Sequence, residues 1–405
     1  MGTSDQHQTP ASQLRGGANQ SGVRAYNERL LMSLLQRNGP TPGIDLARQT
    51  GLSAQTVSVI LRKLEKDGLL QKGPIQKGKV GKPSVPMGLN PRGILSFGFK
   101  IGRRTADLVL LDVSGKIYGQ RQLRYDVPTP PEILTFLERA LGELSDQTPQ
   151  SLHPRICGLG VAMPFEIWKW GPKFGASEDA LAGWKSLDFA ASVGTFCTLP
   201  LRVTNDTTAA CRAEHIFGDG KAFRDYAYFY LGAFVGGGVV MNDSVVEGNR
   251  GNAGALGSLP TTNAQGERCQ LLDLASLRQL EQRLQASGGD PQRLWQRPLD
   301  WGSFASHTEE WVETCALELT RASQAVCAVI DFDAILIDGA MPDTVKQDLV
   351  DRIRQHVQDM HAPGLLPPEV HAGKVGIDAR AIGAAAGPIV NQFLLDRTAA
   401  PLAGN

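Results

Sequence analysis

The stretch ILSFGFKIGRRTADLVLLDVSG, residues 94–115, predicts two apolar strands joined by a short polar turn. The polar turn falls at residues 101–103, and the Ser-Gly pair at 114–115 forms a second turn that leads into a third strand. The strands that we expect here lie at residues 94–101, 105–112 and 117–124.

The chain beyond this hairpin alternates between the two kinds of secondary structure. Further strands are expected at residues 156–163, 201–204, 226–231, 237–241 and 333–338. Helices are expected at residues 131–145, 206–216, 307–330, 343–358 and 378–395. Such a pattern indicates an α/β body with two lobes around a cleft.

Composition excludes several classes of protein. The 405 residues are 42% hydrophobic and 20% charged, and they accommodate two or three domains of about 100–200 residues each. No apolar run approaches the roughly 20 residues of a membrane-spanning helix, so we expect no membrane partner. Residues 1–22 are polar, without an apolar signal core, and are expected to form a disordered tail. The six cysteines show no CxxC pairing, which favours reduced thiols and a cytoplasmic location.

The charge is unevenly distributed along the chain. The net charge is zero overall, but residues 21–92 contain twelve Lys and Arg side chains against four acidic ones. The remainder of the chain therefore carries an excess of acids. A basic head on an acidic body indicates that the head alone binds a polyanion.

The basic head has the helix spacing of a helix-turn-helix. Residues 27–37 predict a first helix, which the Asn-Gly-Pro sequence at 38–40 ends. A short second helix is followed by a turn at Gly51 and by a third helix with Ser53 as its N-cap. A small residue four positions before Gly51 allows the last two helices to cross closely. The apolar side of the third helix repeats at i, i+3, i+4 and i+7, with Val57, Ile60, Leu61 and Leu64.

The third helix and the segment after it are expected to contact double-stranded operator DNA. The polar start of the helix would meet base edges and its later basic residues would meet phosphates. Residues 72–91 alternate lysine, glycine and apolar residues, which predicts a hairpin wing whose GKVGKP segment lies along a minor groove. An ordinary three-helix domain with solvated lysines is the alternative. The predicted DNA-binding residues are Ser53, Gln55, Thr56, Ser58, Arg62, Lys63, Lys77, Lys79 and Lys82.

Four stretches of the body follow one another in an order that is similar to a known family. They are FKIGRRTADLVLLD (99–112), LRVTNDTTAACRAEHIFGDG (201–220), LGAFVGGGVV (231–240) and GNRGNAGALGS (248–258). With the basic head, they make the chain resemble the ROK family, which contains sugar kinases of actin-like ATPase fold and repressors with an added winged helix-turn-helix. In that family the stretches form a first phosphate hairpin, an Asn-Asp strand and helix, a second phosphate loop, and a sugar and zinc segment.

The resemblance implies the fold class and the domain organisation. We expect an α/β chain in which a winged helix-turn-helix precedes a two-lobed, actin-like (ribonuclease H-like) body. The repressor branch further implies a homodimer or a dimer of dimers. The expected parts are the tail (1–22), the DNA-binding head (23–91), an N-terminal lobe (92–200, with 378–397 packed back on it) and a C-terminal lobe (201–377).

Several kinase features are altered. Phosphoryl transfer requires phosphates held by backbone donors and Mg²⁺, a base, and an oriented sugar. By the resemblance, Lys100 stands where the kinases have an acid, so a charge that attracts metal becomes one that repels it. Arg-Arg at 103–104 and Ala-Phe at 233–234 replace smaller or hydroxyl-bearing residues. We therefore expect no enzyme activity. Lys100 would then either pair with Asp206 across the cleft or bind an anionic effector.

The resemblance also suggests a ligand pocket. Asp206 stands where the family keeps the aspartate that takes the sugar's proton, and Asn205 where an Asn holds a neighbouring hydroxyl. The alternative is that Asp206 only caps the helix that follows it. The predicted ligand-binding residues for a sugar or sugar derivative are Asn205, Asp206, Glu166, Asn252, Ser258 and Lys100.

Two further family features are lost. Ala255 replaces a sugar-binding Glu, Ser258 replaces a zinc-binding His, and Cys269 is the one cysteine nearby, so we expect neither zinc nor another cofactor. Trp184 matches a family tryptophan that we expect to pack inside a lobe. For Trp168 and Trp170 two roles stay open, as lid residues or as packing residues.

Three functions are compatible with these observations. The leading interpretation is a cytoplasmic, sugar-responsive repressor of a carbohydrate uptake or catabolism operon. The second is an ATP-dependent sugar kinase with an appended DNA-binding head. The third is a constitutive DNA-binding regulator whose ligand pocket is vestigial.

Overall fold

The computed structural model describes residues 20–74, 85–174, 176–359 and 363–395. The predicted wing lysines Lys77, Lys79 and Lys82 and most of the expected tail lie outside these residues. The first helix begins at Gln20, inside the range 1–22 that we expected to be tail and seven residues before the start predicted for this helix.

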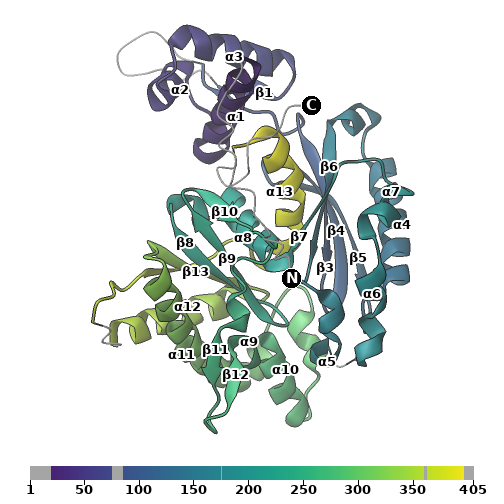
Figure 1. Cartoon of the computed structure of the whole chain (residues 1–405), viewed down its shortest axis with the longest axis vertical. Helices are drawn as coiled ribbons and strands as arrows, with labels where there is room; N and C mark the ends of the chain where they lie inside the picture. The colour runs from purple at the N-terminus through teal and green to yellow at the C-terminus, as the bar shows by residue number, and fades with distance from the viewer. Residues whose placement is uncertain (1–19, 75–84, 175, 360–362, 396–405) are drawn as a thin grey trace, which may run out of the picture.

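The head contains three helices and a two-stranded antiparallel sheet (Figure 1). Its elements are α1 (Gln20–Asn38), α2 (Gly43–Thr50), α3 (Ala54–Lys66), β1 (Leu70–Lys72) and β2 (Met87–Leu89). Gly51 ends α2 with φ +71°, a left-handed conformation that glycine adopts without strain. The helix-turn-helix predicted from spacing is therefore present. In the sequence, the paired strands β1 and β2 flank the GKVGKP segment of the expected wing.

The body is built on two five-stranded sheets. The first sheet has the order β5-β4-β3-β6-β7 and the second has the order β10-β9-β8-β13-β14. The strands of the first sheet are β3 (Leu95–Ile101), β4 (Thr105–Asp112), β5 (Ile117–Arg124), β6 (Ile156–Met163) and β7 (Leu201–Asn205). Those of the second are β8 (Tyr226–Leu231), β9 (Val235–Met241), β10 (Ser244–Val246), β13 (Ala334–Gly339) and β14 (Glu369–Ala372).

Helices cover both sheets (Figure 1). The long helices of the body are α4 (Pro130–Gln147), α8 (Asp206–Phe217), α10 (Leu277–Ala286), α11 (Ala305–Val329), α12 (Asp343–Asp359) and α13 (Ala379–Phe393). The short elements are α5 (Gly171–Phe174), α6 (Gly183–Ser186), α7 (Phe189–Gly194), α9 (Leu271–Leu274), β11 (Pro260–Thr262) and β12 (Arg268–Gln270). Each strand and helix expected in the body is present to within a few residues. Among the described residues, sequence reasoning missed α10, β10, β14, the small β11–β12 hairpin and the short helices α5, α6, α7 and α9.

Helix α13 packs unusually close to its neighbours because glycines face it. A Cβ on Gly98 of β3 would lie 2.2 Å from the carbonyl oxygen of Ala381, and one on Gly160 of β6 would lie 1.8 Å from that of Ala384. On the other side, a Cβ on Gly383 would lie 1.6 Å from the carbonyl oxygen of Ala209 in α8. Only residues without a side chain allow α13 to lie between the first sheet and α8.

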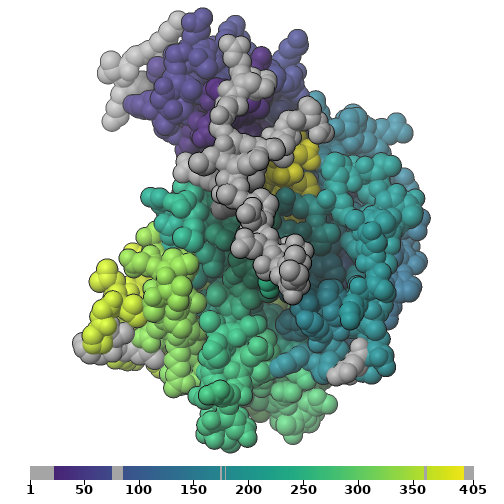
Figure 2. All heavy atoms as spheres, viewed as in Figure 1, coloured from purple at the N-terminus to yellow at the C-terminus, as the bar shows by residue number. Residues whose placement is uncertain are grey.

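The head rests on the body through the same helix. Leu31 and Leu35 of α1 belong to one apolar cluster with Leu111 of β4 and with Ala385 and Ile389 of α13. Polar contacts surround this cluster: Arg37 pairs with Asp243 at 2.5 Å, and the Gln36 amide donates to the carbonyl of Ile216 at 2.6 Å. Figure 2 shows the head at one end of the molecule, beside α13.

A single methyl group tests the importance of this close packing. We expect Gly160→Ala to lower the free energy of unfolding by about 3 kcal/mol, because the new Cβ overlaps the α13 backbone. Gly142→Ala is the matched control. It lies on the exposed side of α4 with no atom within 4 Å of a Cβ, and it should stabilise the protein by up to ~1 kcal/mol. Denaturant unfolding measures both, and equal stability of the two variants would contradict the packing argument.

Candidate functional site

The third helix of the head is held by its own cap and by an apolar side. The Ser53 hydroxyl accepts a hydrogen bond from the Thr56 N–H at 3.1 Å, and the two hydroxyls lie 2.9 Å apart. Val57, Ile60, Leu61 and Leu64 are buried, as the spacing predicted. Ser53 and Thr56 therefore hold the start of α3 in place, a role that is compatible with contacts to DNA.

The opposite side of α3 is open to solvent. Gln55, Ser58, Val59 and Arg62 are exposed and follow one another at i, i+3, i+4 and i+7, so they form one stripe along the helix. Lys63 lies beside this stripe, and its ammonium contacts both carboxylate oxygens of Glu28 at 2.7 Å. Lys63 is thus tied to α1, whereas Arg62 has no carboxylate partner among the described residues.

Val59 is a residue that sequence reasoning missed. It is 47% exposed in the middle of the stripe, although it is apolar. The signal was available, because the helical spacing that buries Val57 and Ile60 places Val59 on the outer side. An exposed valine at this position is suited to contact the methyl group of a thymine in a major groove.

Five of the six predicted ligand residues line one cavity of about 520 Å³ in the body. They are Asn205, Asp206, Glu166, Asn252 and Ser258. The apolar part of the wall includes Trp170, Phe234 and Leu272. A cavity with a few polar groups on an apolar wall is typical of a small-molecule site.

The local fold explains why these polar residues meet. Asn205 ends β7 and Asp206 begins α8, so both side chains stand at the carboxyl edge of the first sheet. The Asn205 amide donates to the Asn252 side-chain oxygen at 3.4 Å. Glu166 has a left-handed backbone, with φ 49°, and pairs with Lys169 at 2.7 Å. The five predicted polar residues of the wall therefore come from three separate parts of the chain.

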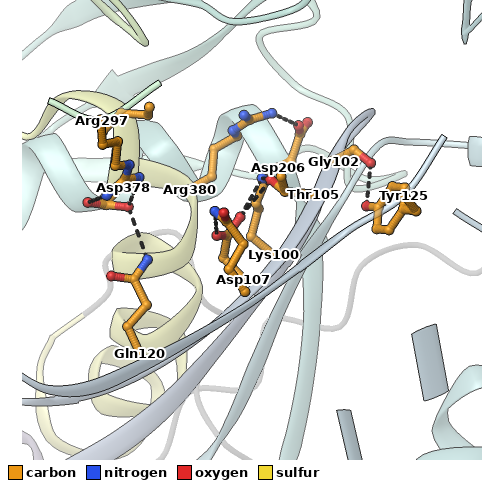
Figure 3. A network of polar contacts seen from close by, with 12 residues as sticks. Lys100, Gly102, Thr105, Asp107, Gln120, Tyr125, Asp206, Arg297, Asp378 and Arg380 are labelled. Atoms are coloured by element: carbon orange, nitrogen blue, oxygen red, sulfur yellow. Dashed lines mark hydrogen bonds and ion pairs between the residues drawn. The ribbon is translucent and has the colours of Figure 1, made fainter. Parts of the chain in front are cut away.

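The carboxylate of Asp206 pairs with an arginine that the sequence did not indicate. Arg380, in the first turn of α13, donates to Asp206 at 3.2 Å and lies over the ring of Tyr230 (Figure 3). Burial works to lower the pKa of Arg380, but Tyr230 and Asp206 raise it above its ordinary value, so the guanidinium stays charged. Of the two roles left open for Lys100, the pairing with Asp206 is wrong, because Arg380 pairs with that carboxylate and Lys100 pairs with Asp107.

Lys100 pairs instead with a residue on the neighbouring strand. It is 7% exposed, and its ammonium lies 2.7 Å from Asp107 and 2.6 Å from the Thr105 hydroxyl (Figure 3). The register of β3 and β4 places Lys100 directly opposite Asp107. Burial lowers the pKa of Lys100. Burial would raise the pKa of Asp107, but Lys100, Gln122 and Thr105 outweigh it and hold that pKa below its usual value.

Lys100 lines a second cavity, of about 680 Å³, rather than the one that holds the other predicted ligand residues. The two cavities share Arg103, Ala233 and Arg380 in their walls. At the turn between β3 and β4, Arg104 pairs with the buried Glu281 of α10 at 3.0 Å. The hairpin is thereby connected to the part of the body built around the second sheet.

The three tryptophans singled out in the sequence, Trp168, Trp170 and Trp184, pack against apolar neighbours. Trp184 is buried and donates to the carbonyl of Pro128 at 2.7 Å, as expected for a packing residue. Trp170 contacts the apolar cores of both sheets, and its ring lies 5.5 Å from that of Phe234. Trp168 packs against the first core. Phe234 therefore fills part of the loop between β8 and β9.

Two further searches concern the described residues alone. In this part of the chain, no group of three or more His, Cys, Asp or Glu side chains is placed to hold a metal ion. No described helix combines the length and the apolar character that a bilayer crossing requires.

The chain is similar to characterised families over most of its length. The ROK family pattern matches residues 96–388, and a winged helix-turn-helix DNA-binding pattern matches residues 24–71. The uncharacterized protein y4fQ of Sinorhizobium fredii is 26% identical over 91% of this chain and 92% of its own length. The xylose repressor of Bacillus subtilis is 25% identical over 62% of this chain, and the matched part is 64% of that repressor.

An enzyme and a solved structure complete these similarities. The N-acetylmannosamine kinase of Haemophilus influenzae is 25% identical over 69% of this chain and 91% of its own length. The crystal structure of a ROK family transcriptional regulator, a homologue of the Escherichia coli MLC protein, superposes with a TM-score of 0.66 at 19% identity. That superposition covers 92% of this chain and 97% of the regulator. The fold class predicted from the sequence, a winged helix-turn-helix before an actin-like body, is confirmed.

The buried Lys100–Asp107 pair can be tested by removing its cation. Lys100→Met leaves Asp107 charged and buried, so we expect the free energy of unfolding at pH 7 to fall by about 3 kcal/mol. The loss should shrink as the pH approaches 4, because the buried Asp107 of the variant, without its cation, takes up a proton and becomes neutral. In the wild type Lys100 holds the pKa of Asp107 below its usual value, so that carboxylate stays charged there. Denaturant unfolding at several pH values measures this. The exposed Lys185→Met is the control, and a pH-independent loss would contradict the explanation.

Proposed function

The chain belongs to the ROK family, and on that premise we propose that it is a sugar-responsive transcriptional repressor of a carbohydrate uptake or catabolism operon. The match to a winged helix-turn-helix and the similarity to a xylose repressor support a regulator that binds DNA. The matched part is less than two thirds of that repressor, so its sugar is not transferred to this chain.

One observation carries the proposal. Helix α13 begins in the ligand cavity, where Arg380 contacts Asp206, and ends under the head, where Arg29 of α1 donates to the carbonyl of Val390 at 3.3 Å. The helix has 15 residues, so it spans about 22 Å. A single helix therefore runs from the proposed ligand cavity to the head.

The mechanism follows from this connection. A sugar in the cavity of about 520 Å³ would offer hydroxyl groups to Asp206, Asn205 and Asn252, and it would compete with Arg380 for the Asp206 carboxylate. A displacement of the first turn of α13 would move the other end of this helix, against which α1 packs. The orientation of the two heads of a dimer would change as a result. The size of the response is limited by the difference in sugar affinity between the two orientations.

We further propose the parts of the chain that carry these roles. Residues 23–91 form the DNA-binding head. Residues 92–200, with 378–397, form one lobe, and residues 201–377 form the other. The functional unit is a cytoplasmic homodimer or dimer of dimers, because the two half-sites of an operator require two recognition helices related by a two-fold axis.

An ATP-dependent kinase is the second candidate, and the similarity to an N-acetylmannosamine kinase keeps it open to test. We propose that the chain is not an enzyme. Lys100 places a positive charge in the hairpin, Arg104 is engaged by Glu281, and Phe234 fills the second loop. Turnover of ATP in the presence of a sugar would refute this.

A constitutive DNA-binding regulator is the third candidate function. It is favoured if no sugar stabilises the protein against heat.

Variants of the exposed stripe on α3, which consists of Gln55, Ser58, Val59 and Arg62, should fall into two kinds. Gln55→Ala and Val59→Ala should each reduce discrimination between operator and non-operator DNA by about 1–3 kcal/mol, because these side chains face base edges. Arg62→Ala should weaken binding about evenly on all sequences and reduce its salt dependence, because Arg62 faces phosphates. Titrations of labelled DNA at several salt concentrations separate the two effects. An unchanged preference in both Gln55→Ala and Val59→Ala would place the recognition surface elsewhere.

The sugar cavity predicts a variant with an altered response. A screen of sugars by thermal shift first identifies one that stabilises the protein. Asn252→Ala should then raise the sugar concentration needed to change operator binding by about tenfold, because one hydrogen bond to a sugar hydroxyl is lost. Operator affinity without sugar should stay the same. Gln355→Ala, which removes an exposed amide on α12, is the control. Equal responses of the two variants would exclude Asn252 from the site.

A further inference from the structure

The larger cavity of the body, of about 680 Å³, has a positively charged wall. It lies between the β3–β4 hairpin, the outer strand β5, the segment around Trp295 and the first turn of α13. Two acids, Asp107 and Asp126, are also in the wall. The cations that line the cavity are Lys100, Arg103, Arg104, Arg124, Arg297 and Arg380.

Most of the carboxylates that pair with these cations are not part of the cavity wall. Arg103 and Arg104 share one buried carboxylate, that of Glu281, at 3.6 and 3.0 Å. Arg297 pairs with Asp378 at 2.7 Å (Figure 3). Asp378 itself is not part of the cavity wall. Because guanidinium groups cover these carboxylates, the surface that a ligand would meet is more positive than the whole cluster.

Arg124 adds a cation with no carboxylate partner among the described residues. It is exposed near the end of β5, where alternate residues point to the same side of the strand. Gln120, Gln122 and Arg124 accordingly all line the cavity. The intervening Arg121 does not line it, and it pairs with Glu143 of α4 at 2.6 Å. One side of β5 thus faces the cavity with a guanidinium and two amides. Each amide nitrogen already donates one hydrogen bond to a carboxylate, that of Gln120 to Asp378 at 3.4 Å and that of Gln122 to Asp107 at 2.5 Å, and each has a second N–H.

Arginines approach the cavity from three directions. Arg124 comes from β5, Arg297 comes from the segment after Trp295, and Arg380 comes from α13. A planar carboxylate has two oxygens and is matched by one guanidinium fork. A phosphoryl group has three oxygens directed to different sides and carries up to two negative charges, so it suits several guanidinium groups that converge from separate walls.

We propose that this cavity binds a small phosphorylated metabolite without a metal ion. The phosphoryl group would lie between Arg124, Arg297 and Arg380, and the glutamine amides of β5 would donate to the rest of the ligand. Lys100 adds to the positive potential from the hairpin, which disfavours a divalent cation at the same place. The cavity shares Arg103, Ala233 and Arg380 with the neighbouring sugar cavity, whereas Arg124 and Arg297 line it alone. Binding at this place does not depend on whether the chain binds an operator.

The test uses the full chain and glycerol 3-phosphate as probe, because this compound has a phosphoryl group and no sugar ring. Isothermal titration in buffer with EDTA should show binding that inorganic phosphate weakens by competition. Arg124→Gln and Arg297→Gln should each reduce the affinity at least tenfold, since a charge-assisted hydrogen bond is lost in each. Arg121→Gln removes the same charge from the other side of β5 and should leave the affinity unchanged.

Several results would overturn the proposal. Binding that appears only with Mg²⁺, or affinity that is the same in Arg124→Gln and in the wild type, would show that the cations of this wall do not hold the ligand. Glycerate that binds as tightly as glycerol 3-phosphate would show that a carboxylate suffices and that the ligand class is wrong. Asn252→Ala should not change the affinity, because Asn252 lines only the sugar cavity. A failure of the sugar response is thus distinguishable from a failure of this site.

Discussion

The close approach of α13 to the first sheet and to α8 is the constraint on which the rest of the structure depends. It is possible because Gly98, Gly160 and Gly383 have no side chains at positions where a Cβ would overlap backbone atoms. With that contact in place, one end of α13 brings Arg380 to Asp206, and the other end supports α1 of the head. The ligand cavity and the DNA-binding surface are therefore parts of one packed unit.

The electrostatics of the cleft follow from a few buried ion pairs. Lys100 and Asp107 face each other across β3 and β4, and both are nearly excluded from water. Charges in such a place are tolerated only when they are paired and hydrogen-bonded. Glu281 meets the same requirement by accepting from Arg104 and from the Trp295 indole at 2.7 Å. These pairs turn a hairpin that resembles a phosphate-binding element into one that carries fixed positive charge.

Sequence reasoning was most accurate where local patterns determine structure. The spacing of Val57, Ile60, Leu61 and Leu64 predicted the buried side of α3, and Ser53 is the cap that it was expected to be. It also named five candidate ligand residues that the structure places in the wall of one cavity. It did not identify Arg380 as the partner of Asp206, because that contact joins residues 174 positions apart. It was wrong about the partner of Lys100, which lies only seven positions away, because the register of β3 and β4 was not used to pair side chains across the hairpin. It missed Val59 because only polar and basic residues were sought on the outer side of that helix.

The amino-acid sequence by itself determined the order of helices and strands, the basic head, the N-cap of α3 and the family. These follow from helical and strand periodicity, local hydrogen bonding and short motifs, which act within a few residues. Only the tertiary structure decided that Asp206 pairs with Arg380, that Lys100 pairs with Asp107, and that the arginines of the cleft converge on one cavity. Such pairings depend on strand register and on how sheets and helices pack, because the charge of a side chain does not specify which partner the fold will bring to it.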